Sequence, residues 1–202
     1  MSIAIIDYGA GNIQSIRFAM ERLGFSTILT NKVDEIQQAD RVIFPGVGEA
    51  SSAMTKLQAS RLDTLIPTLT QPVLGICLGM QLMCNHSEEG NTKGLGIFDT
   101  EVKRFDNQLK VPHMGWNKSS HADSGLFEGV SDQSYFYMVH SYYAKMSDQT
   151  IASMNYGLEF STALQKDNFY GVQFHPESID TESGHLLLSN FIAETKNWSI
   201  SR

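Results

Sequence analysis

The chain has 202 residues, 42% hydrophobic and 18% charged, which is typical of a single folded globular domain over residues 1–202. Its net charge of −7 argues against a nucleic-acid partner, because binding phosphates requires a surplus of lysine and arginine. The apolar runs are too short for a membrane span and no basic leader is present, so we expect a cytoplasmic protein. Its two cysteines, Cys77 and Cys84, are expected to be free thiols, the latter a packed core thiol.

The first half of the chain alternates short apolar runs with stretches of helical spacing. Strands are predicted at residues 2–7, 25–30, 41–45 and 73–77. Helices are predicted at 13–23, at 33–38, within 49–69 and from 78 onward. This order predicts an α/β fold with a central, mainly parallel sheet flanked by helices. Ligands of such sheets bind beyond the carboxyl ends of the strands.

The second half changes to short strands joined by turns. These strands are predicted at 97–105, 134–144, 151–157, 159–167 and 169–176. They indicate additional antiparallel strands in the C-terminal half, joined to the parallel sheet or packed beside it. The polar, glycine-rich residues 85–95 are expected to form a surface loop, and residues 183–196 a final helix.

Cofactor and metal sites are not favoured by the motifs. The stretch "DYGAGNI" (7–13) offers Gly9 and Gly11, but Gln14 stands where a dinucleotide fingerprint has its third glycine. A tight turn is therefore the favoured interpretation. The six histidines show no metal-ligand spacing, so we expect neither a cofactor nor a metal.

The stretch "GICLG" (75–79) has the form of a nucleophile elbow with cysteine in place of serine. A sharp strand-to-helix turn would project the Cys77 side chain, and side chains at Gly75 or Gly79 would clash. The start of a helix favours the thiolate, which is the reactive form. The amide of Leu78 would then face a developing oxyanion. The alternative is a packed cysteine beside two turn glycines.

A base for this cysteine is offered by "VQFHPES" (172–178). We expect the strand to end at His175 and Pro176 to keep the chain extended. Since residues i and i+2 of an extended chain point to the same side, His175 and Glu177 should project together. The carboxylate would orient the imidazole, as in catalytic triads.

The loop "PGVG" (45–48) is a candidate for a second oxyanion donor, through the backbone amide at Val47. The alternative is an ordinary β–α turn. Two glycines allow a peptide to flip at modest cost. We therefore expect an oxyanion hole that is completed when a loaded partner docks.

These pieces together resemble the class I, or triad, glutamine amidotransferases over nearly the whole chain. In that family a cysteine attacks the side-chain amide of glutamine, forms a γ-glutamyl thioester and releases ammonia. The resemblance implies that Cys77 is the nucleophile, His175 the general acid and base, and Glu177 its orienting group. The substrate contacts that it implies are Gly46, Gly48, Gln81, Ser141 and Tyr142. On its own, Gln81 could equally be an ordinary exposed helix residue.

Within the family, the resemblance is greatest to the glutaminase subunits of imidazole glycerol phosphate synthase, in histidine biosynthesis. It rests on residues 6–15, 45–50, 75–83, 111–117 and 137–143. In that subfamily "HMGWN" (113–117) lies toward the partner subunit. The resemblance thus implies interface residues Asn12, Met114, Trp116 and Asn117.

The segment after the triad departs from the subfamily. There H-P-E is usually followed by a basic residue and a serine, whereas this chain has Ser178 and Ile179, with one residue inserted. That tail is more similar to the glutaminase partners of anthranilate or aminodeoxychorismate synthase. The identity of the synthase therefore stays open, and sugar-amidinating paralogues are a further alternative.

A partner is expected because free ammonia becomes mostly ammonium in neutral water and must travel through a dry passage. The resemblance implies a heterodimer with a (β/α)8-barrel cyclase docked over the carboxyl ends of the strands. Two other classes remain open from sequence: a Cys-His hydrolase of related α/β fold, and a glutaminase-like domain retained for binding alone.

Overall fold

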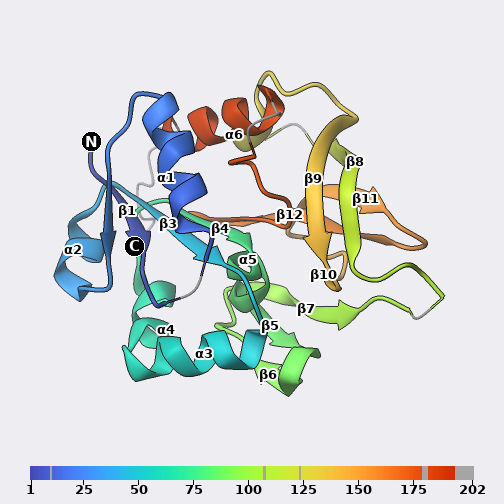
Figure 1. Ribbon diagram of the computed structural model, residues 1–202, viewed down its shortest axis with the longest axis horizontal. Coiled ribbons are helices and arrows are strands. Elements are labelled where there is room, and N and C mark those ends of the chain that lie inside the picture. Colours follow the sequence, from blue (N-terminus) through green and yellow to red (C-terminus); the bar gives the residue numbers. More distant parts are fainter. Residues whose placement is uncertain (10, 107, 123, 179–181, 194–202) are drawn as a thin grey trace.

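The computed structural model describes residues 1–9, 11–106, 108–122, 124–178 and 182–193. Parallel strands form one half of the sheet (Figure 1). In spatial order they are β2 (Thr27–Thr30), β1 (Ile3–Ile6), β3 (Arg41–Gly46), β4 (Val73–Cys77) and β13 (Phe169–Val172). Each was predicted, although the last is shorter than expected.

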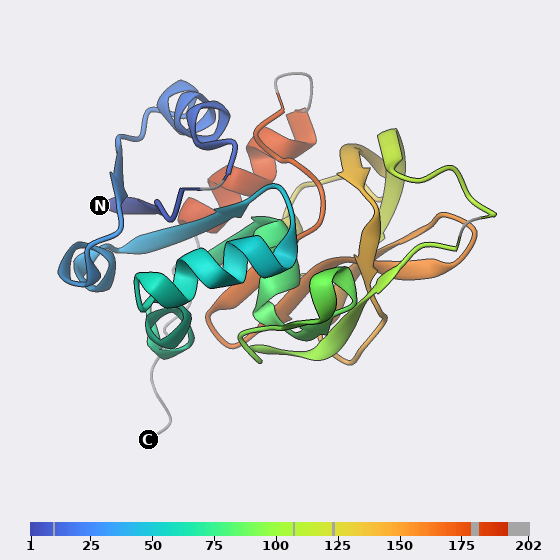
Figure 2. The same cartoon turned by 60° about the horizontal axis from the view of Figure 1, so that its bottom comes forward.

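Helices cover both faces of this parallel half, as predicted (Figure 2). One face carries α1 (Ile13–Arg22) and α6 (Glu182–Ala193). The opposite face carries α2 (Val33–Gln38), α3 (Ala50–Ala59), α4 (Leu62–Leu65) with η1 (Ile66–Thr68), and α5 (Leu78–Met83). None of the helices in the described residues is long and apolar enough to cross a membrane.

The core forms on both sides of the sheet because successive strand residues point to opposite faces. In β1, Ala4 and Ile6 join the α2–α5 side, whereas Ile3 and Ile5 join the α1–α6 side. All four are buried, as expected for a strand of a sheet that is covered twice. The continuous apolar runs in this half are explained by that double burial.

The second half of the sheet is largely antiparallel and continues the first through β12, which pairs with β13. Its strands are β7 (Phe98–Arg104), β8 (His113–His121), β9 (Ser134–His140), β10 (Tyr142–Ala144), β11 (Thr150–Asn155) and β12 (Glu159–Lys166). A short η3 turn (Gly125–Phe127) connects β8 and β9. The α/β fold with added antiparallel strands is therefore confirmed.

Two expectations about this half were wrong, and one strand was missed. The segment 85–95 is not a plain loop, because it forms β5 (Cys84–Ser87), η2 (Glu89–Asn91) and β6 (Thr92–Lys93), held by pairing with β7. The expected strand 134–144 breaks at Ser141, where the chain leaves β8 as its neighbour and joins β7. Strand β8 was not predicted at all.

Candidate active site

Three adjacent parallel strands end at one edge of the sheet and bring the predicted catalytic groups together. Gly46 at the end of β3 pairs with Cys77 at the end of β4. On the other side of β4, Ile76 pairs with Val172, the last residue of β13. The chain that follows β13 reaches His175 within three residues. The convergence of sulfur and imidazole therefore follows from strand order and register.

Cys77 has the strained backbone of a nucleophile elbow. Its φ of 54° and ψ of −113° are unfavourable for a residue with a Cβ atom. The flanking glycines are required sterically: a Cβ at Gly75 would lie 2.5 Å from the sulfur of Met83, and one at Gly79 would overlap the carbonyl oxygen of Phe44. The helix that follows, α5, has six residues, so the local amides matter more here than a long helix dipole.

His175 and Glu177 form the expected pair, with 2.8 Å between Nδ1 and Oε1. The extended conformation expected for this segment is wrong, since β13 ends at Val172. The amide of Ser178 donates to the carbonyl of His175 at 3.2 Å and closes a turn. Pro176 occupies the second position of that turn, which proline favours. A turn, and not an extended strand, therefore brings the two side chains together.

The other ring nitrogen of His175, Nε2, faces the nucleophile. It is buried and has no hydrogen bond of regular geometry among the described residues, an arrangement common in catalytic pairs before substrate binds. Burial alone would lower the pKa of His175, but its interactions with the Cys77 sulfur and the Glu177 carboxylate raise that pKa to about 10. The ring therefore holds its proton at neutral pH.

The "PGVG" loop is fixed at its start and open at its end. Tyr8 donates its hydroxyl proton to the carbonyl of Pro45 at 2.9 Å. A Cβ at Gly46 would lie 2.6 Å from the amide nitrogen of Gly79, so this glycine permits a close approach between β3 and α5. Gly48 has a φ of +96° and free space around it. The start of the loop, at Pro45 and Gly46, is therefore held in place, whereas its end at Gly48, which lines the site, has space to change conformation.

A cavity of about 370 Å³ opens onto the sulfur. Among the residues predicted to bind substrate or oxyanion, its lining includes Val47, Gly48, Leu78, Gln81, Ser141 and Tyr142, together with Cys77 and His175. Gly46 was also predicted to contact substrate, but it does not line this cavity and serves the packing of α5. Gln81 is 4% exposed, so it is not an ordinary surface residue.

Comparisons with known proteins bear on this geometry. The family described as "Glutamine amidotransferase class-I" matches residues 4–195. The chain belongs to the class I glutamine amidotransferases.

Individual relatives agree with that assignment. The chain is 52% identical over 195 residues to a Bacteroides fragilis protein named "Imidazole glycerol phosphate synthase subunit HisH", covering 95% of this chain and 99% of the relative. It is 47% identical over 194 residues to the protein of the same name from Haemophilus influenzae, covering 95% and 97%.

Solved structures support the fold. A glutamine amidotransferase crystal structure superposes with a TM-score of 0.72 at 16% identity, covering 95% of this chain and 97% of that one. The structure of PurLQS from Thermotoga maritima gives a TM-score of 0.70 at 14% identity, covering 95% and 97%. The arrangement of the sheet is therefore shared far beyond close relatives.

Two side chains of this amidotransferase site were missed by the motif analysis. The Glu89 carboxylate lines the cavity, accepts a hydrogen bond from the amide of Ala50 at 2.9 Å and has a pKa raised by burial. Gln173 is fully buried and its Nε2 lies 3.8 Å from the Cys77 sulfur. Gln173 stands two residues before His175, and in the extended segment that was predicted here the two side chains would point to the same side, which was a usable signal. Glu89 lies in the segment 85–95 that was predicted to be a surface loop, and no sequence motif marked it as a binding residue.

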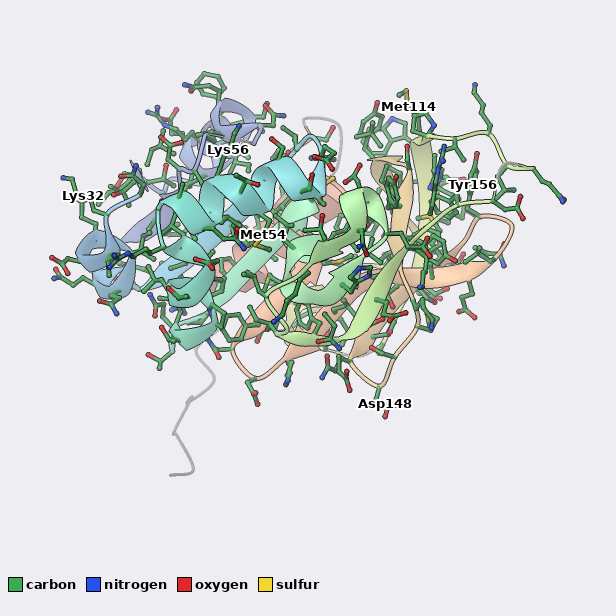
Figure 3. All side chains as sticks on the ribbon, turned by 90° about the horizontal axis from the view of Figure 1, so that it is seen from below. Lys32, Met54, Lys56, Met114, Asp148 and Tyr156 are labelled. Atoms are coloured by element: carbon green, nitrogen blue, oxygen red, sulfur yellow. The ribbon has the colours of Figure 1, made fainter. Side chains whose placement is uncertain are left out.

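The predicted partner-facing residues divide into two groups. Met114 and Trp116 on β8 are 61% and 42% exposed, and Met114 projects from the edge of the molecule in Figure 3. Asn117 was grouped with them, but its Nδ2 turns inward to His113 Nε2 at 3.4 Å. The interface role of Asn117 stays a prediction.

Asn12 lines a second cavity of about 620 Å³ beside the first. Val47, Val139 and His175 line both cavities. Ser178, the start of the segment that departs from the subfamily, lines the larger cavity, whereas residues 179–181 lie outside the described part of the chain. The space around the triad thus continues toward the α1 side of the molecule.

Cys84 is a buried free thiol, as expected, and its sulfur lies 3.5 Å from the carbonyl oxygen of Met80. Burial raises the pKa of this thiol well above its ordinary value. Cys84 is therefore unreactive and provides a natural control for Cys77.

Proposed function

We propose that this chain is the glutaminase subunit of imidazole glycerol phosphate synthase, and that it hydrolyses L-glutamine to glutamate and ammonia. The observation that carries the proposal is the convergence of Cys77, His175 and Glu177 at the ends of adjacent strands, beside a cavity. The names of relatives about half identical over nearly the whole chain support the choice of synthase.

The reaction begins when the Cys77 sulfur attacks the side-chain amide carbon of glutamine. The amide of Leu78, and that of Val47 after adjustment of the loop, hold the oxyanion. His175 gives its Nε2 proton to the departing nitrogen, so ammonia leaves and a γ-glutamyl thioester remains. The neutral imidazole then takes a proton from water, whose oxygen attacks the thioester and releases glutamate. Glu177 holds Nδ1 throughout, which fixes the ring and stabilises its charged form.

Recognition of glutamine requires a partner for each of its polar ends. We assign the α-ammonium group to the Glu89 carboxylate, which lines the cavity and lies near no lysine or arginine in the described contacts. Gln81, Ser141 and Tyr142 are placed to contact the rest of the substrate. Gly48 lets the backbone approach it closely.

The ammonia acceptor lies on a second protein in this proposal, a (β/α)8-barrel cyclase in a heterodimer. The exposed Met114 and Trp116 are suited to such an interface, where exposed aromatic and methionine side chains are enriched. The larger cavity shares lining residues with the catalytic one and offers a path for neutral ammonia past Val47 and Val139. A cytoplasmic location fits two free thiols.

Partner docking is proposed to complete the oxyanion hole. Tyr8 and the packing of Gly46 hold the start of the loop, whereas Gly48 is free to change conformation. Glutaminase activity should therefore be low when the chain is isolated and should rise when the barrel protein holds its substrate. Equal turnover with and without the loaded partner would contradict this regulation.

The proposal is tested with Cys77→Ser, using Cys84→Ala as the matched control. In the complex, Cys77→Ser should lower glutamine-dependent product formation about 10⁴-fold or more, in line with other lost nucleophiles. Excess ammonia should still support synthesis, and the control should retain glutamine use. If Cys77→Ser kept its glutaminase activity, the mechanism would be wrong. If the barrel cyclase neither bound nor stimulated the chain, another synthase would be its partner.

A further inference from the structure

A continuous series of hydrogen bonds runs from strand β8 to the nucleophile. It begins at Asn117, whose Nδ2 lies 3.4 Å from His113 Nε2. His113 Nδ1 then lies 3.1 Å from His140 Nε2, and His140 Nδ1 lies 2.7 Å from the carbonyl oxygen of Tyr142. That carbonyl is also the acceptor for Gln81 in the active site.

The direction of each hydrogen bond follows from the acceptor at the end of the series. A carbonyl can only accept, so Nδ1 of His140 carries a proton. Burial lowers the pKa of His140 and keeps the ring neutral, so its Nε2 has no proton and must accept. His113 therefore donates from Nδ1, and its own Nε2 accepts from the amide of Asn117. Both imidazoles are thereby neutral and each has one defined tautomer.

Aromatic packing fixes both rings. His113 stacks on Tyr156 with ring centroids 4.0 Å apart, and Phe105 packs against His113 and His140. The two histidines are 3% and 6% exposed. A buried, close-packed pair of this kind has little freedom to change its hydrogen bonds.

The series continues through two glutamines to the sulfur. Gln81 Nε2 donates to the Tyr142 carbonyl at 3.0 Å and to Gln173 Oε1 at 2.7 Å, which uses both of its protons. Since the Gln173 oxygen is the acceptor there, its nitrogen must face Cys77, with 3.8 Å between Nε2 and Sγ. Gln173 is 0% exposed, so water does not compete for this contact.

We propose that Gln173 is a further catalytic residue, which donates a hydrogen bond to the Cys77 sulfur, and that His113 and His140 position it through Gln81. This inference rests on the proposed glutaminase function. A sulfur anion gains more from such a donor than a neutral thiol does, because hydrogen bonds to charged groups are the stronger ones. Gln173 therefore favours the nucleophilic, thiolate form of Cys77.

The same series leaves the Gln81 carbonyl oxygen as the free polar end of that side chain. With both protons committed to Tyr142 and Gln173, this oxygen is the group that Gln81 can offer to an N–H of the substrate. His113 does not line the cavity, whereas His140 does. Neither ring has a hydrogen bond to the sulfur among the described contacts, so toward the thiol both act as positioning residues.

The test measures the reactivity of the thiol in the free, full-length chain, without glutamine or partner. Rates of Cys77 carbamidomethylation by iodoacetamide at pH 7 are followed by mass spectrometry. Gln173→Leu should slow the reaction by about tenfold, as expected for loss of a hydrogen bond to a charged group. Gln173→Asn, which withdraws the amide by one methylene, should slow it as well and covers the case in which the leucine variant fails to fold. Gln165→Leu, on β12, is the matched control and should react like wild type.

The positioning role is tested with Gln81→Leu and His140→Phe in the same assay. Neither side chain has a hydrogen bond to the sulfur among the described contacts, yet both variants should slow alkylation, Gln81→Leu by about fivefold and His140→Phe by about threefold, each below the full effect of losing the donor. Melting temperatures identify variants that lost their fold. Folded Gln173 variants with wild-type alkylation rates would overturn the inference.

The two proposals fail in different ways. If wild type with its partner released no glutamate, the proposed function would be wrong, whatever the alkylation rates were. If Cys77→Ser abolished glutamine use but the Gln173 variants alkylated normally, the glutaminase would stand and the role of Gln173 would fall.

Discussion

The parallel and antiparallel halves of the sheet contribute different things to one site. The parallel half supplies the proposed reacting groups, Cys77 and His175, from backbone turns at strand ends. The antiparallel half supplies His140, Ser141 and Tyr142 around the cavity, and His113, which is hydrogen-bonded to His140. The proposed reacting groups are therefore placed by main-chain geometry, whereas the antiparallel half contributes part of the cavity lining through side chains whose positions depend on strand pairing.

This difference between the two halves indicates which positions of the site tolerate substitution. A glycine at position 79 cannot be replaced without displacing the Phe44 carbonyl, so the elbow is held by steric exclusion. The hydrogen bonds of the antiparallel half can be weakened singly, and each loss should give a graded effect. Variants in the parallel half should therefore have large effects on activity, and variants in the antiparallel half should have smaller, graded effects.

The largest effect is expected for Glu177→Gln in the parallel half. The amide keeps the size of the side chain but removes the charge that stabilises protonated His175, so kcat should fall about 10³- to 10⁴-fold, as in other triads. KM for glutamine should change little. Steady-state glutaminase assays of the stimulated complex check this, with Glu159→Gln, on exposed β12 surface, as the control. A loss below tenfold would show that the carboxylate does not orient the base.

Trp116→Ala is expected to weaken partner binding about 10- to 100-fold, since exposed tryptophans are frequent interface anchors. Titration calorimetry with the barrel cyclase measures the Kd. Ile28→Ala removes a comparably exposed apolar side chain on the edge strand β2, at the other end of the sheet, and should leave the Kd unchanged. Equal Kd values for both variants and wild type would place the interface elsewhere.

Glu89→Gln should raise KM for glutamine about tenfold with a small effect on kcat, because it removes the proposed charge partner of the substrate ammonium. Its amide oxygen can still accept from Ala50, so the start of α3 stays intact. Glu101→Gln, on β7 and paired with Lys103, is the surface control. A drop in kcat at constant KM would assign Glu89 to chemistry and not to binding.

The smallest effect concerns stability at mildly acidic pH. Burial lowers the pKa of His140 from 6.5 to about 3, with the neighbouring His113 and His175 acting in the same direction. Stability from this group is present above pH 6.5 and is lost as the pH falls toward 3, because the unfolded chain binds a proton that the native pair excludes. Between pH 7 and pH 5 the loss is about 2 kcal/mol. In urea unfolding, the free energy of unfolding of His140→Phe should fall less between pH 7 and pH 5 than that of wild type. The control His86→Gln should behave as wild type.

The sequence predicted the parallel half well, for a physical reason. Strands buried on both faces are continuous apolar runs, and α2 at residues 33–38 was predicted to the residue. The elbow glycines and the pairing of His175 with Glu177 were also predicted, the glycines because strain and steric exclusion leave few residue types that fit.

The antiparallel half was predicted less well because its stability comes from pairing. Strand β8 alternates buried His113 and Ser119 with exposed Met114 and Trp116, and none of these marks a strand by itself. The hydrogen bond between His113 and His140 joins residues 27 apart and depends on the register of β8 with β9. Such contacts leave no local signal in the sequence.

The most direct test of the central claim is to trap the covalent intermediate. The stimulated complex is mixed with glutamine, quenched in acid and digested, and the peptides are analysed by mass spectrometry. The mechanism predicts a γ-glutamyl thioester on Cys77, none on Cys84, and its loss in Cys77→Ser. Glutamine turnover without an adduct on Cys77, under conditions that preserve thioesters and slow deacylation, would contradict the account.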